Sequence, residues 1–351
     1  MNTKYTERLK KIEEQLAEVL PQTTADAWIE KLIGYQSLVA SQESIRRIIS
    51  PALDLIERGG KRWRPMLLVL CSEIVNPDLS IEDNPALPLV SLVEFAHNGS
   101  LIIDDIEDNA DFRRGGPAVH LKYGEDVALN CGNLLYFLPT WVIDRSNFPP
   151  ETKLAFYASY NLTMRRLHLG QGLDIQWHRD HEYFPSVEEY LQMCRLKTGS
   201  LSALAAKLGA LAGGGGEAES ELLSGICEDI GVGFQILDDV VNLTKGVPGK
   251  RRGDDIIEGK KSLCVIIHWK EAPETVGRLK ELFAYTARKN HGEVIPEIEE
   301  AISLMEASGS IEKARNTAHR MLQDAANRLC NSFRPSESRD LILEMISGFL
   351  S

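Results

Sequence analysis

Leu101-Ile102-Ile103-Asp104-Asp105-Ile106-Glu107-Asp108 carries an apolar run directly into a cluster of acids. In a helix, Asp104 and Asp108 lie one turn apart on the same face, with Asp105 beside them. Like charges at this spacing cost a helix roughly 0.2–0.5 kcal/mol per pair unless a cation lies between them. Carboxylates so placed suit magnesium, which also keeps water ligands and binds substrate phosphates. The stretch therefore predicts a helix that ends in a magnesium site.

A second cluster with the same spacing follows in Phe234-Gln235-Ile236-Leu237-Asp238-Asp239-Val240-Val241-Asn242. Asn242 stands in the position of the third acid, and its amide oxygen can still ligate a metal or a metal-bound water without adding charge. A single acidic cluster at the end of an apolar helix is equally consistent with a solvated helix face. Two matched clusters, each after an apolar run, favour a shared metal site.

Helical periodicity covers most of the remaining chain, and strand signals are nearly absent. Helices are expected over about 6–19, 45–56, 65–74, 87–108, 126–143, 151–169, 187–211, 217–243 and most of 262–351. Glycine and proline clusters separate them, and we interpret Gly213–Gly216 as a tight turn between helices of one domain. The sequence thus predicts an all-α bundle in which residues 1–351 form a single domain. Residues 1–42 form a helical N-terminal extension without a chemical motif, which serves as scaffold or dimer surface.

The composition of the chain argues against several classes of function. Thirty-nine Lys and Arg residues against 51 Asp and Glu residues give a net charge of -12, which argues against nucleic acid or an anionic membrane as the main partner. The longest charge-free stretch, 127–143, is shorter than the roughly 20 residues of a transmembrane helix and is expected to be a buried helix. Six dispersed cysteines without a CxxC pair or a secretory leader predict reduced thiols in a cytoplasmic protein. His178 and His181 have the spacing of a metal pair, but a solvated loop is the favoured interpretation.

Basic residues frame both acidic clusters. Lys61 and Arg64 follow Gly59-Gly60 at a predicted helix start, where backbone N–H groups also favour a phosphate. Arg113 and Arg114 follow the first cluster, and arginine can grip phosphate oxygens bidentately. The second cluster is preceded by Lys197-Thr198 and followed by Lys250 and Lys260. Each cation alone is typical of a protein surface, but the set predicts two diphosphate pockets.

From about Ser44 to Ser262 these motifs resemble the trans-isoprenyl diphosphate synthases. Gly59 to Pro65 is similar to the GGKRxRP motif of that family, Asp104 to Asp108 to its DDxxD motif, and Phe234 to Asn242 to its FQxxDDxxD motif. The segments Arg113-Arg114-Gly115, Gly170 to Asp174, Lys197-Thr198 and Gly249 to Lys260 also fall where the family has theirs. The resemblance implies the isoprenoid synthase fold, a single large helical bundle around a central cavity, and a homodimer.

The resemblance also implies residue roles. Asp104, Asp108 and Asp238 are expected to ligate Mg2+, supported by Asp105, Asp239 and Asn242, with about three ions per site. Isopentenyl diphosphate is assigned to Lys61, Arg64, His97 and Arg114. The allylic diphosphate (dimethylallyl, geranyl or farnesyl) is assigned to Arg113, Lys197, Thr198, Gln235, Lys250 and Lys260. Catalysis is expected to depend on both aspartate motifs together with Arg113 and Lys197.

Product length should depend on the helix before Asp104, where each turn adds about 5.4 Å of depth. The small residues Ala96, Gly99 and Ser100 leave room for a long prenyl tail. Tyr136, Phe137 and His168 resemble the floor residues of geranylgeranyl diphosphate synthases, although aromatic residues in a buried helix are equally often plain core. We therefore expect geranylgeranyl diphosphate as the product, with a farnesyl or longer polyprenyl product as the alternative.

Two other functions fit less well. A class I terpene cyclase would replace the second motif with an Asn/Asp, Ser/Thr and Glu triad, which is absent after Phe234. A catalytically silent subunit of a hetero-oligomeric synthase would be expected to lose one acidic cluster, and both are present. The sequence therefore favours an active head-to-tail synthase.

Overall fold

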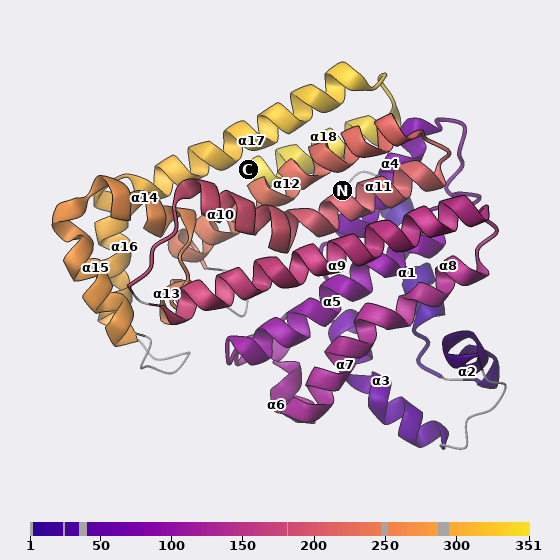
Figure 1. The fold of residues 1–351 in the computed structure, drawn as a ribbon, viewed down its shortest axis with the longest axis horizontal. Helices are drawn as coiled ribbons and strands as arrows, with labels where there is room; N and C mark the ends of the chain where they lie inside the picture. The colour runs from indigo at the N-terminus through magenta and orange to yellow at the C-terminus, as the bar shows by residue number, and fades with distance from the viewer. Residues whose placement is uncertain (1–2, 24, 35–40, 181, 247–251, 287–294) are drawn as a thin grey trace. The chain divides into compact units, whose positions relative to one another are not determined.

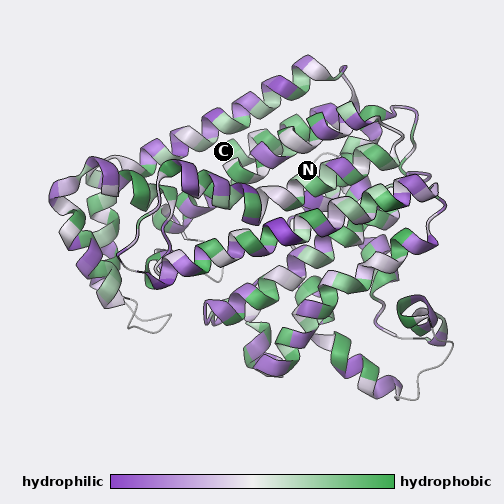
Figure 2. Cartoon of the chain, in the orientation of Figure 1, coloured by the Kyte–Doolittle hydropathy of each residue, from purple (hydrophilic) through white to green (hydrophobic). Residues whose placement is uncertain are grey.

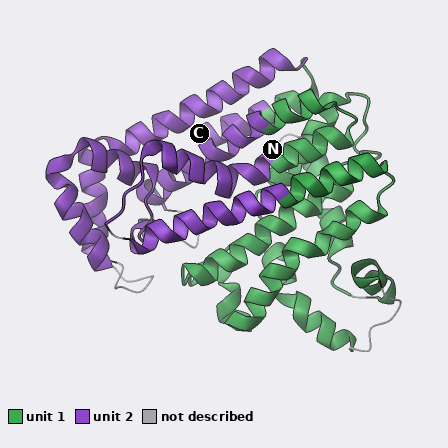
Figure 3. Ribbon diagram, in the orientation of Figure 1, with its two compact units in different colours: residues 1–161, 204–224, 335–342 green, residues 162–203, 225–334, 343–351 purple. Residues whose placement is uncertain are grey.

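The computed structural model is almost entirely helical (Figure 1) and describes all residues except 1–2, 24, 35–40, 181, 247–251 and 287–294. The chain divides into two compact units, which interleave along the sequence (Figure 3). Unit 1 comprises residues 1–161, 204–224 and 335–342, and unit 2 comprises 162–203, 225–334 and 343–351. The first aspartate motif belongs to unit 1 and the second to unit 2.

Unit 1 holds most of the N-terminal half. Its elements are α1 (Thr3–Val19), α2 (Asp26–Ile33), α3 (Gln42–Glu57), α4 (Trp63–Val75), η1 (Leu87–Leu89), α5 (Val90–Glu107), β1 (Phe112–Arg113), β2 (Gly116–Pro117), α6 (Val119–Tyr123), α7 (Glu125–Phe137), η2 (Leu138–Thr140) and α8 (Trp141–Arg145). Helices α9 (Pro150–Arg179), α11 (Ser200–Ala212), α12 (Glu217–Thr244) and α18 (Glu337–Leu350) contribute residues to both units.

The α5 helix is the core of unit 1, because nearly every residue from Val90 to Ala96 is buried. It packs directly on α7, where a Cβ added at Gly99 would lie 2.7 Å from the carbonyl oxygen of Gly132. Two facing glycines therefore let the helix backbones approach closely. This contact fixes the position of the C-terminal end of α5, which carries the first aspartate motif.

The N-terminal helix α1 is built into unit 1. Its Ile12 and Leu16 are buried, and the guanidinium of Arg8 donates to Glu73 of α4. Ser338 also donates to Glu73. A buried charge needs such pairing to offset its desolvation, so these contacts hold α1 in one register on the bundle. The α1 helix is thus part of unit 1, and the role of the N-terminal extension as scaffold or dimer surface stays a prediction.

Unit 2 is also helical. Its own elements are α10 (Val187–Cys194), the π-helical turn η3 (Arg195–Gly199), α13 (Asp254–Ile257), α14 (Leu263–Glu271), α15 (Pro273–Thr286), α16 (Pro296–Ala307) and α17 (Ser310–Ser332). In Figure 2, hydrophobic and hydrophilic residues alternate along α17, as expected of a helix with one face on the core. Ser186 and Glu189 form a capping box that fixes the start of α10.

These observations confirm the all-helical fold. The predicted helix over 126–143 is interrupted at η2, because Pro139 cannot donate a backbone hydrogen bond. The predicted helix over 187–211 contains the π-helical turn η3. All six cysteines are free thiols, as expected. None of the described helices combines the length and apolar character that a bilayer span requires.

Candidate active site

The first aspartate motif lies at the C-terminal end of α5. Asp104 and Asp105 occupy its last turn, and Asp108 is the C-cap residue. The negative end of a helix dipole disfavours carboxylates, so three acids here require positive charge nearby. Arg113 of β1 supplies some of it: its Nε donates to Asp105 Oδ1 at 2.8 Å, and its NH2 lies 3.8 Å from Asp104 Oδ2. The Asp105 side chain is fully buried in this ion pair.

A short hairpin presents the two arginines that follow the motif. Strands β1 and β2 pair antiparallel, with Phe112 opposite Pro117. Arg58 of α3 holds the hairpin, because its NH1 donates to the carbonyl oxygens of Arg113 (2.9 Å) and Pro117 (2.8 Å). Arg114 has a positive φ of 49°, an uncommon conformation for a residue other than glycine. The hairpin therefore sets the direction of both arginines.

Several cations surround His97 on α5. Burial lowers the pKa of His97 well below its usual range, and the charges of Arg64, Arg114, Arg113 and Arg62 lower it further. Burial also lowers the pKa of Arg114 to about 10. These arginines repel one another beside a neutral imidazole, and a bound anion would offset that repulsion. Of the four residues predicted for isopentenyl diphosphate, this cluster contains three, His97, Arg64 and Arg114.

Lys61, the fourth, has an exposed side chain just before α4. Arg114 is held in place by α3 and α5, because its NH1 donates to the carbonyl oxygen of Leu55 at 3.2 Å and to Asn98 Oδ1 at 2.9 Å. Asn98 in turn donates to Glu94 Oε1 at 2.9 Å. These supporting polar residues were not predicted from the sequence, although buried acids on an apolar helix are a usable signal.

Arg62 has a structural role that the sequence reasoning missed. Its Nε donates to Glu13 (2.7 Å), its NH1 to Glu94 (2.6 Å) and its NH2 to the carbonyl oxygen of Ile56 (2.7 Å). Only 1% of its side chain is exposed. Arg62 therefore joins α1, α3 and α5 at the point where α4 begins.

The three small residues of α5 that were predicted to make room for the prenyl tail have different surroundings. Ala96 and Gly99 are buried, and Gly99 lies against Gly132 and Tyr136 of α7. Ser100 donates to the carbonyl oxygen of His97 at 2.8 Å. The missing side chain of Gly99 thus serves the close contact of α5 with α7. Whether it also makes room for a tail stays a prediction.

Tyr136 and Phe137 differ in their exposure to solvent. Tyr136 is 5% exposed, and burial raises its pKa above the usual range, as do the nearby charges of Glu107 and Asp104. Phe137 is 70% exposed, because one further residue along a helix turns the side chain by about 100°. His168 is exposed as well. Within the single chain, Phe137 and His168 therefore do not line a buried floor, which corrects the expectation for both.

The second aspartate motif occupies the last two turns of α12. Its Asp239 is buried and accepts hydrogen bonds from neutral donors: the Tyr190 hydroxyl at 2.7 Å and Gln235 Nε2 at 2.8 Å. Thr198 in turn donates to Gln235 Oε1 at 2.9 Å. Burial raises the pKa of Asp239 to about 7, and the charges of Asp255 and Asp238 add to the shift. Crowded carboxylates of this kind form a site that favours a bound cation.

Asn242 accepts hydrogen bonds from residues that follow α12 in the sequence. Its side-chain oxygen accepts from the backbone N–H of Asp255 at 3.4 Å, and its carbonyl oxygen accepts from Gly253 at 3.0 Å. Lys260 Nζ lies 3.2 Å from Asp255 Oδ1 and 2.5 Å from Glu258 Oε2. The sequence predicted a metal-ligating role for Asn242, and the structure adds a local structural role. Lys250 lies outside the described residues.

Lys197 lies in the π-helical turn η3, where an extra residue per turn is often found at functional sites. Its Nζ lies 2.6 Å from Asp174 Oδ2 of α9. His178 Nε2 lies 2.8 Å from the other oxygen of Asp174. The interpretation of His178 as part of a solvated loop was wrong, because it belongs to the last turn of α9 and its side chain is 9% exposed. His181 lies outside the described residues.

The donor set of both motifs, carboxylates at the negative ends of helices, fits a hard divalent cation such as Mg2+. Among the residues that the structure describes, no group of three or more His, Cys, Asp or Glu side chains is arranged to hold a metal ion.

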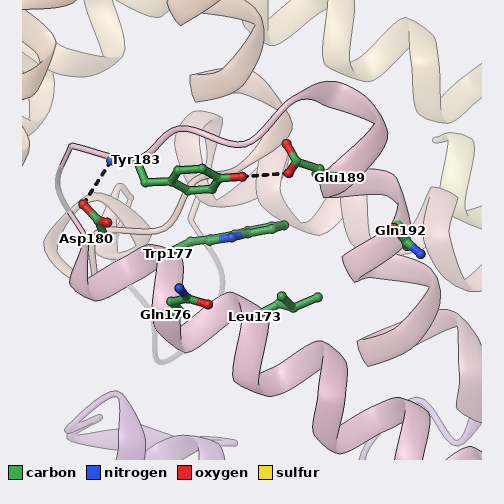
Figure 4. Close-up of a pocket in the computed structure, with 7 residues that line it drawn as sticks. All are labelled: Leu173, Gln176, Trp177, Asp180, Tyr183, Glu189 and Gln192. Atoms are coloured by element: carbon green, nitrogen blue, oxygen red, sulfur yellow. Dashed lines mark hydrogen bonds between the residues drawn. The ribbon is translucent and has the colours of Figure 1, made fainter.

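A different face of α9 borders a hollow of about 350 Å³ (Figure 4). Leu173, Gln176, Trp177, Asp180, Tyr183, Glu189 and Gln192 line it. Tyr183 donates to Glu189 at 2.7 Å, and Asp180 Oδ1 accepts from the backbone N–H of Tyr183 at 3.0 Å. These contacts fix the turn after α9. None of the site residues predicted from the sequence contributes to this hollow.

A family model described as polyprenyl synthetase matches residues 46–302. The chain belongs to this family. It is 34% identical over 300 residues to a geranylgeranyl diphosphate synthase of Methanosarcina mazei, an alignment that covers 85% of this chain and 87% of the relative. It is 36% identical over 266 residues to a short chain isoprenyl diphosphate synthase of Methanocaldococcus jannaschii, covering 75% and 77%.

The fold is shared with a solved structure of geranylgeranyl pyrophosphate synthetase from Pyrococcus horikoshii, with a TM-score of 0.82 and 28% identity over 99% of this chain and 97% of that one. The comparisons confirm the predicted family and the isoprenoid synthase fold. They also confirm that the chain is an enzyme of the prenyl-transferring class.

Proposed function

We propose that this polyprenyl synthetase joins isopentenyl diphosphate head-to-tail (1'-4) to an allylic diphosphate and releases diphosphate. The arginines that contact α5 carry the proposal, because Arg114 hydrogen-bonds Asn98 and Arg113 hydrogen-bonds Asp105, and their charges also lower the pKa of His97. An overall net charge of -12 makes such a concentration of cations in one place a specific feature. It suits the diphosphate of isopentenyl diphosphate, held by Arg64, His97 and Arg114 with Lys61 reaching in from the loop.

We assign the allylic diphosphate to Lys197, Thr198, Gln235 and Lys260, with Arg113 at the first motif and Lys250, which lies outside the described residues. Asp104, Asp108 and Asp238, supported by Asp105, Asp239 and Asn242, would hold about three Mg2+ ions. When bound, such ions would supply charge stabilisation for a departing diphosphate. Tyr190 and Gln235 orient Asp239 by direct hydrogen bonds.

The chemistry then follows from positioning. The C1–O bond of the allylic substrate breaks, and an allylic carbocation forms. The C3–C4 double bond of isopentenyl diphosphate attacks C1 of this cation, and a proton leaves C2 to complete the product. The released diphosphate is the base for that proton. The protein contributes orientation of both substrates and exclusion of water from the cation.

We propose geranylgeranyl diphosphate as the product, with a farnesyl or longer product as the alternative. Buried Tyr136 beside Gly99 supports a limit set by α7, because both lie on the helix contact just before the first motif. Tyr136→Ala is expected to lengthen the product. Asn133→Ala is the matched control, since Asn133 lies on the same helix and its side chain is exposed.

We also propose a homodimer in the cytoplasm. Large apolar side chains remain exposed on unit 1, including Phe137 and Leu154, each about 70% exposed. Covering them with a second copy would remove this apolar surface from water. Sedimentation analysis of the purified protein tests this assembly, and a monomer at all concentrations would contradict it.

The central experiment incubates the purified protein with isopentenyl diphosphate, Mg2+ and each allylic starter in turn. Mass spectrometry then sizes the prenyl diphosphates formed. We expect a product of twenty carbons from dimethylallyl, geranyl and farnesyl starters. Cyclic hydrocarbons, or no product with any starter, would contradict the proposed reaction.

A further inference from the structure

The C-terminal half of α9 contacts the turn that carries Lys197 at two successive levels, and a third residue of α9 contacts the second of them. At the first, a Cβ added at Gly170 would lie only 2.4 Å from the backbone nitrogen of Lys197. At the second, Asp174 Oδ2 lies 2.6 Å from Lys197 Nζ. The third residue, His178, lies one turn beyond Asp174 and contacts its other carboxylate oxygen at 2.8 Å. Both the backbone and the ammonium group of Lys197 are therefore set by α9.

Asp174 needs a second partner to act as a rigid support. A carboxylate with one bonded oxygen can rotate about its χ2 angle, whose energy profile is broad. With His178 on one oxygen and Lys197 on the other, the plane of the carboxylate is fixed. Burial raises the pKa of Asp174, but the charges of Lys197 and His178 outweigh it and hold the pKa below its usual range. Asp174 thus remains charged, with Lys197 donating to one oxygen and His178 Nε2 at 2.8 Å from the other.

The backbone of His178 contacts the segment of the other proposed phosphate ligand. Gly259 has a positive φ of 79°, and a Cβ there would lie 3.1 Å from the carbonyl oxygen of His178. Lys260 follows directly. His178 thus contacts Asp174, the partner of Lys197, and also Gly259, which precedes Lys260.

We propose that His178 is a positioning residue for the allylic diphosphate, acting through Asp174 on Lys197. The inference rests on the proposed function, which assigns Lys197 to that substrate. His178 touches neither substrate nor metal. It fixes the acceptor that aims Lys197, so that the ammonium group is already oriented when the diphosphate arrives.

The test compares His178→Ala, His178→Phe and His178→Gln with the wild-type enzyme. Loss of the ring nitrogen that contacts Asp174 in the Ala and Phe variants should raise KM for the allylic diphosphate about tenfold, the scale of one polar contact. KM for isopentenyl diphosphate should stay within about twofold, well below the effect of one such bond. Gln restores a polar nitrogen and should recover most of the affinity, whereas Phe retains the ring volume without one.

A double-mutant cycle with Lys197→Met separates positioning from general damage. In the Lys197→Met background, His178→Ala should cause no further loss, because its effect passes through Lys197. Arg179→Ala is the matched control, since Arg179 occupies the same turn of α9 and is exposed. Additive effects, an equal rise in both KM values, or a Gln variant as weak as the Ala variant would overturn the proposal.

A second measurement does not need turnover. Calorimetric titration of the full-length protein with inorganic diphosphate and Mg2+ should show about tenfold weaker binding for His178→Ala, again the scale of one polar contact. Circular dichroism melting checks that each variant is folded. A wild-type protein that binds diphosphate without condensing prenyl substrates would contradict the proposed function. In that case, unchanged diphosphate affinity in His178→Ala would separately overturn the positioning role.

Discussion

The two aspartate motifs have the same spacing but different electrostatic surroundings. In unit 1, Arg113 pairs with Asp105 and Asp104, and further arginines surround His97. In unit 2, Asp239 is held by the neutral donors Tyr190 and Gln235, and the neighbouring acids raise its pKa. The first motif therefore includes protein cations, whereas the second concentrates negative charge. The same spacing of acids can therefore serve different parts of one reaction, because the residues around each motif give it a different local charge.

The largest effect is expected from neutralising either motif. Asp104→Asn and Asp238→Asn keep the shape of the side chain and remove its charge, so each should lower kcat on the order of 10³-fold, the scale of several kcal/mol of metal-assisted stabilisation. Steady-state assays at saturating Mg2+ measure this. Asp126→Asn and Asp324→Asn, both exposed acids outside the motifs, are the controls. If one motif variant kept full activity, the two motifs would not act together.

Removing the cation of the first motif should have the next largest effect. Arg113→Gln leaves the fully buried Asp105 without its ion pair and should lower kcat/KM about 10²-fold. Arg113→Lys keeps the charge but loses the two-pronged contact, so we expect an intermediate loss. Equal activity of the Gln and Lys variants would show that charge at Arg113 is not what matters.

Lys261 of unit 2 is a buried cation outside the second aspartate motif, so the effect of its burial on stability can be tested by changing the pH. Lys261 is 2% exposed, and burial lowers its pKa from 10.5 to about 8. Between these pH values the unfolded chain binds more protons than the folded one, so stability rises with pH through this window. Relative to Lys261→Met, the wild type should gain about 2–3 kcal/mol between pH 7 and pH 10. Urea unfolding of both proteins measures the difference, and a constant gap would contradict the shifted pKa.

The smallest effect is expected from the neutral support of the second motif. Tyr190→Phe removes one hydrogen bond to Asp239 and should lower activity about tenfold, with a higher Mg2+ requirement. Titration of activity with Mg2+ checks both parts. A loss as large as that of Asp238→Asn would instead assign Tyr190 a direct role, and no loss would show that Gln235 alone orients Asp239.

The sequence predicted the helices well because their signals are local. Amphipathic periodicity, glycine and proline breaks, and the spacing of the acids depend on residues within one or two turns of each other. The prediction for Phe137 failed for a related reason. Tyr136 and Phe137 look alike as an aromatic pair, but only packing of α7 against α5 determines which one is buried.

Supporting residues were harder to predict. Arg62, Glu94 and Tyr190 are ordinary residues in their local sequence, and their roles depend on partners far along the chain, as between Arg62 and Glu13 or Tyr190 and Asp239. His178 was misassigned because its partner Asp174 becomes a neighbour only if α9 continues to Arg179.

The sequence by itself determined that the chain is helical, which family it resembles, and where the two acidic motifs and their basic companions lie. These features follow from residue type and short spacing. The tertiary structure decided which charges are paired, which aromatics are buried, and which polar groups hold the acids and lysines in place. Those outcomes depend on burial and on contacts between distant segments, because the energy of a charge or hydrogen bond is set by what surrounds it after folding.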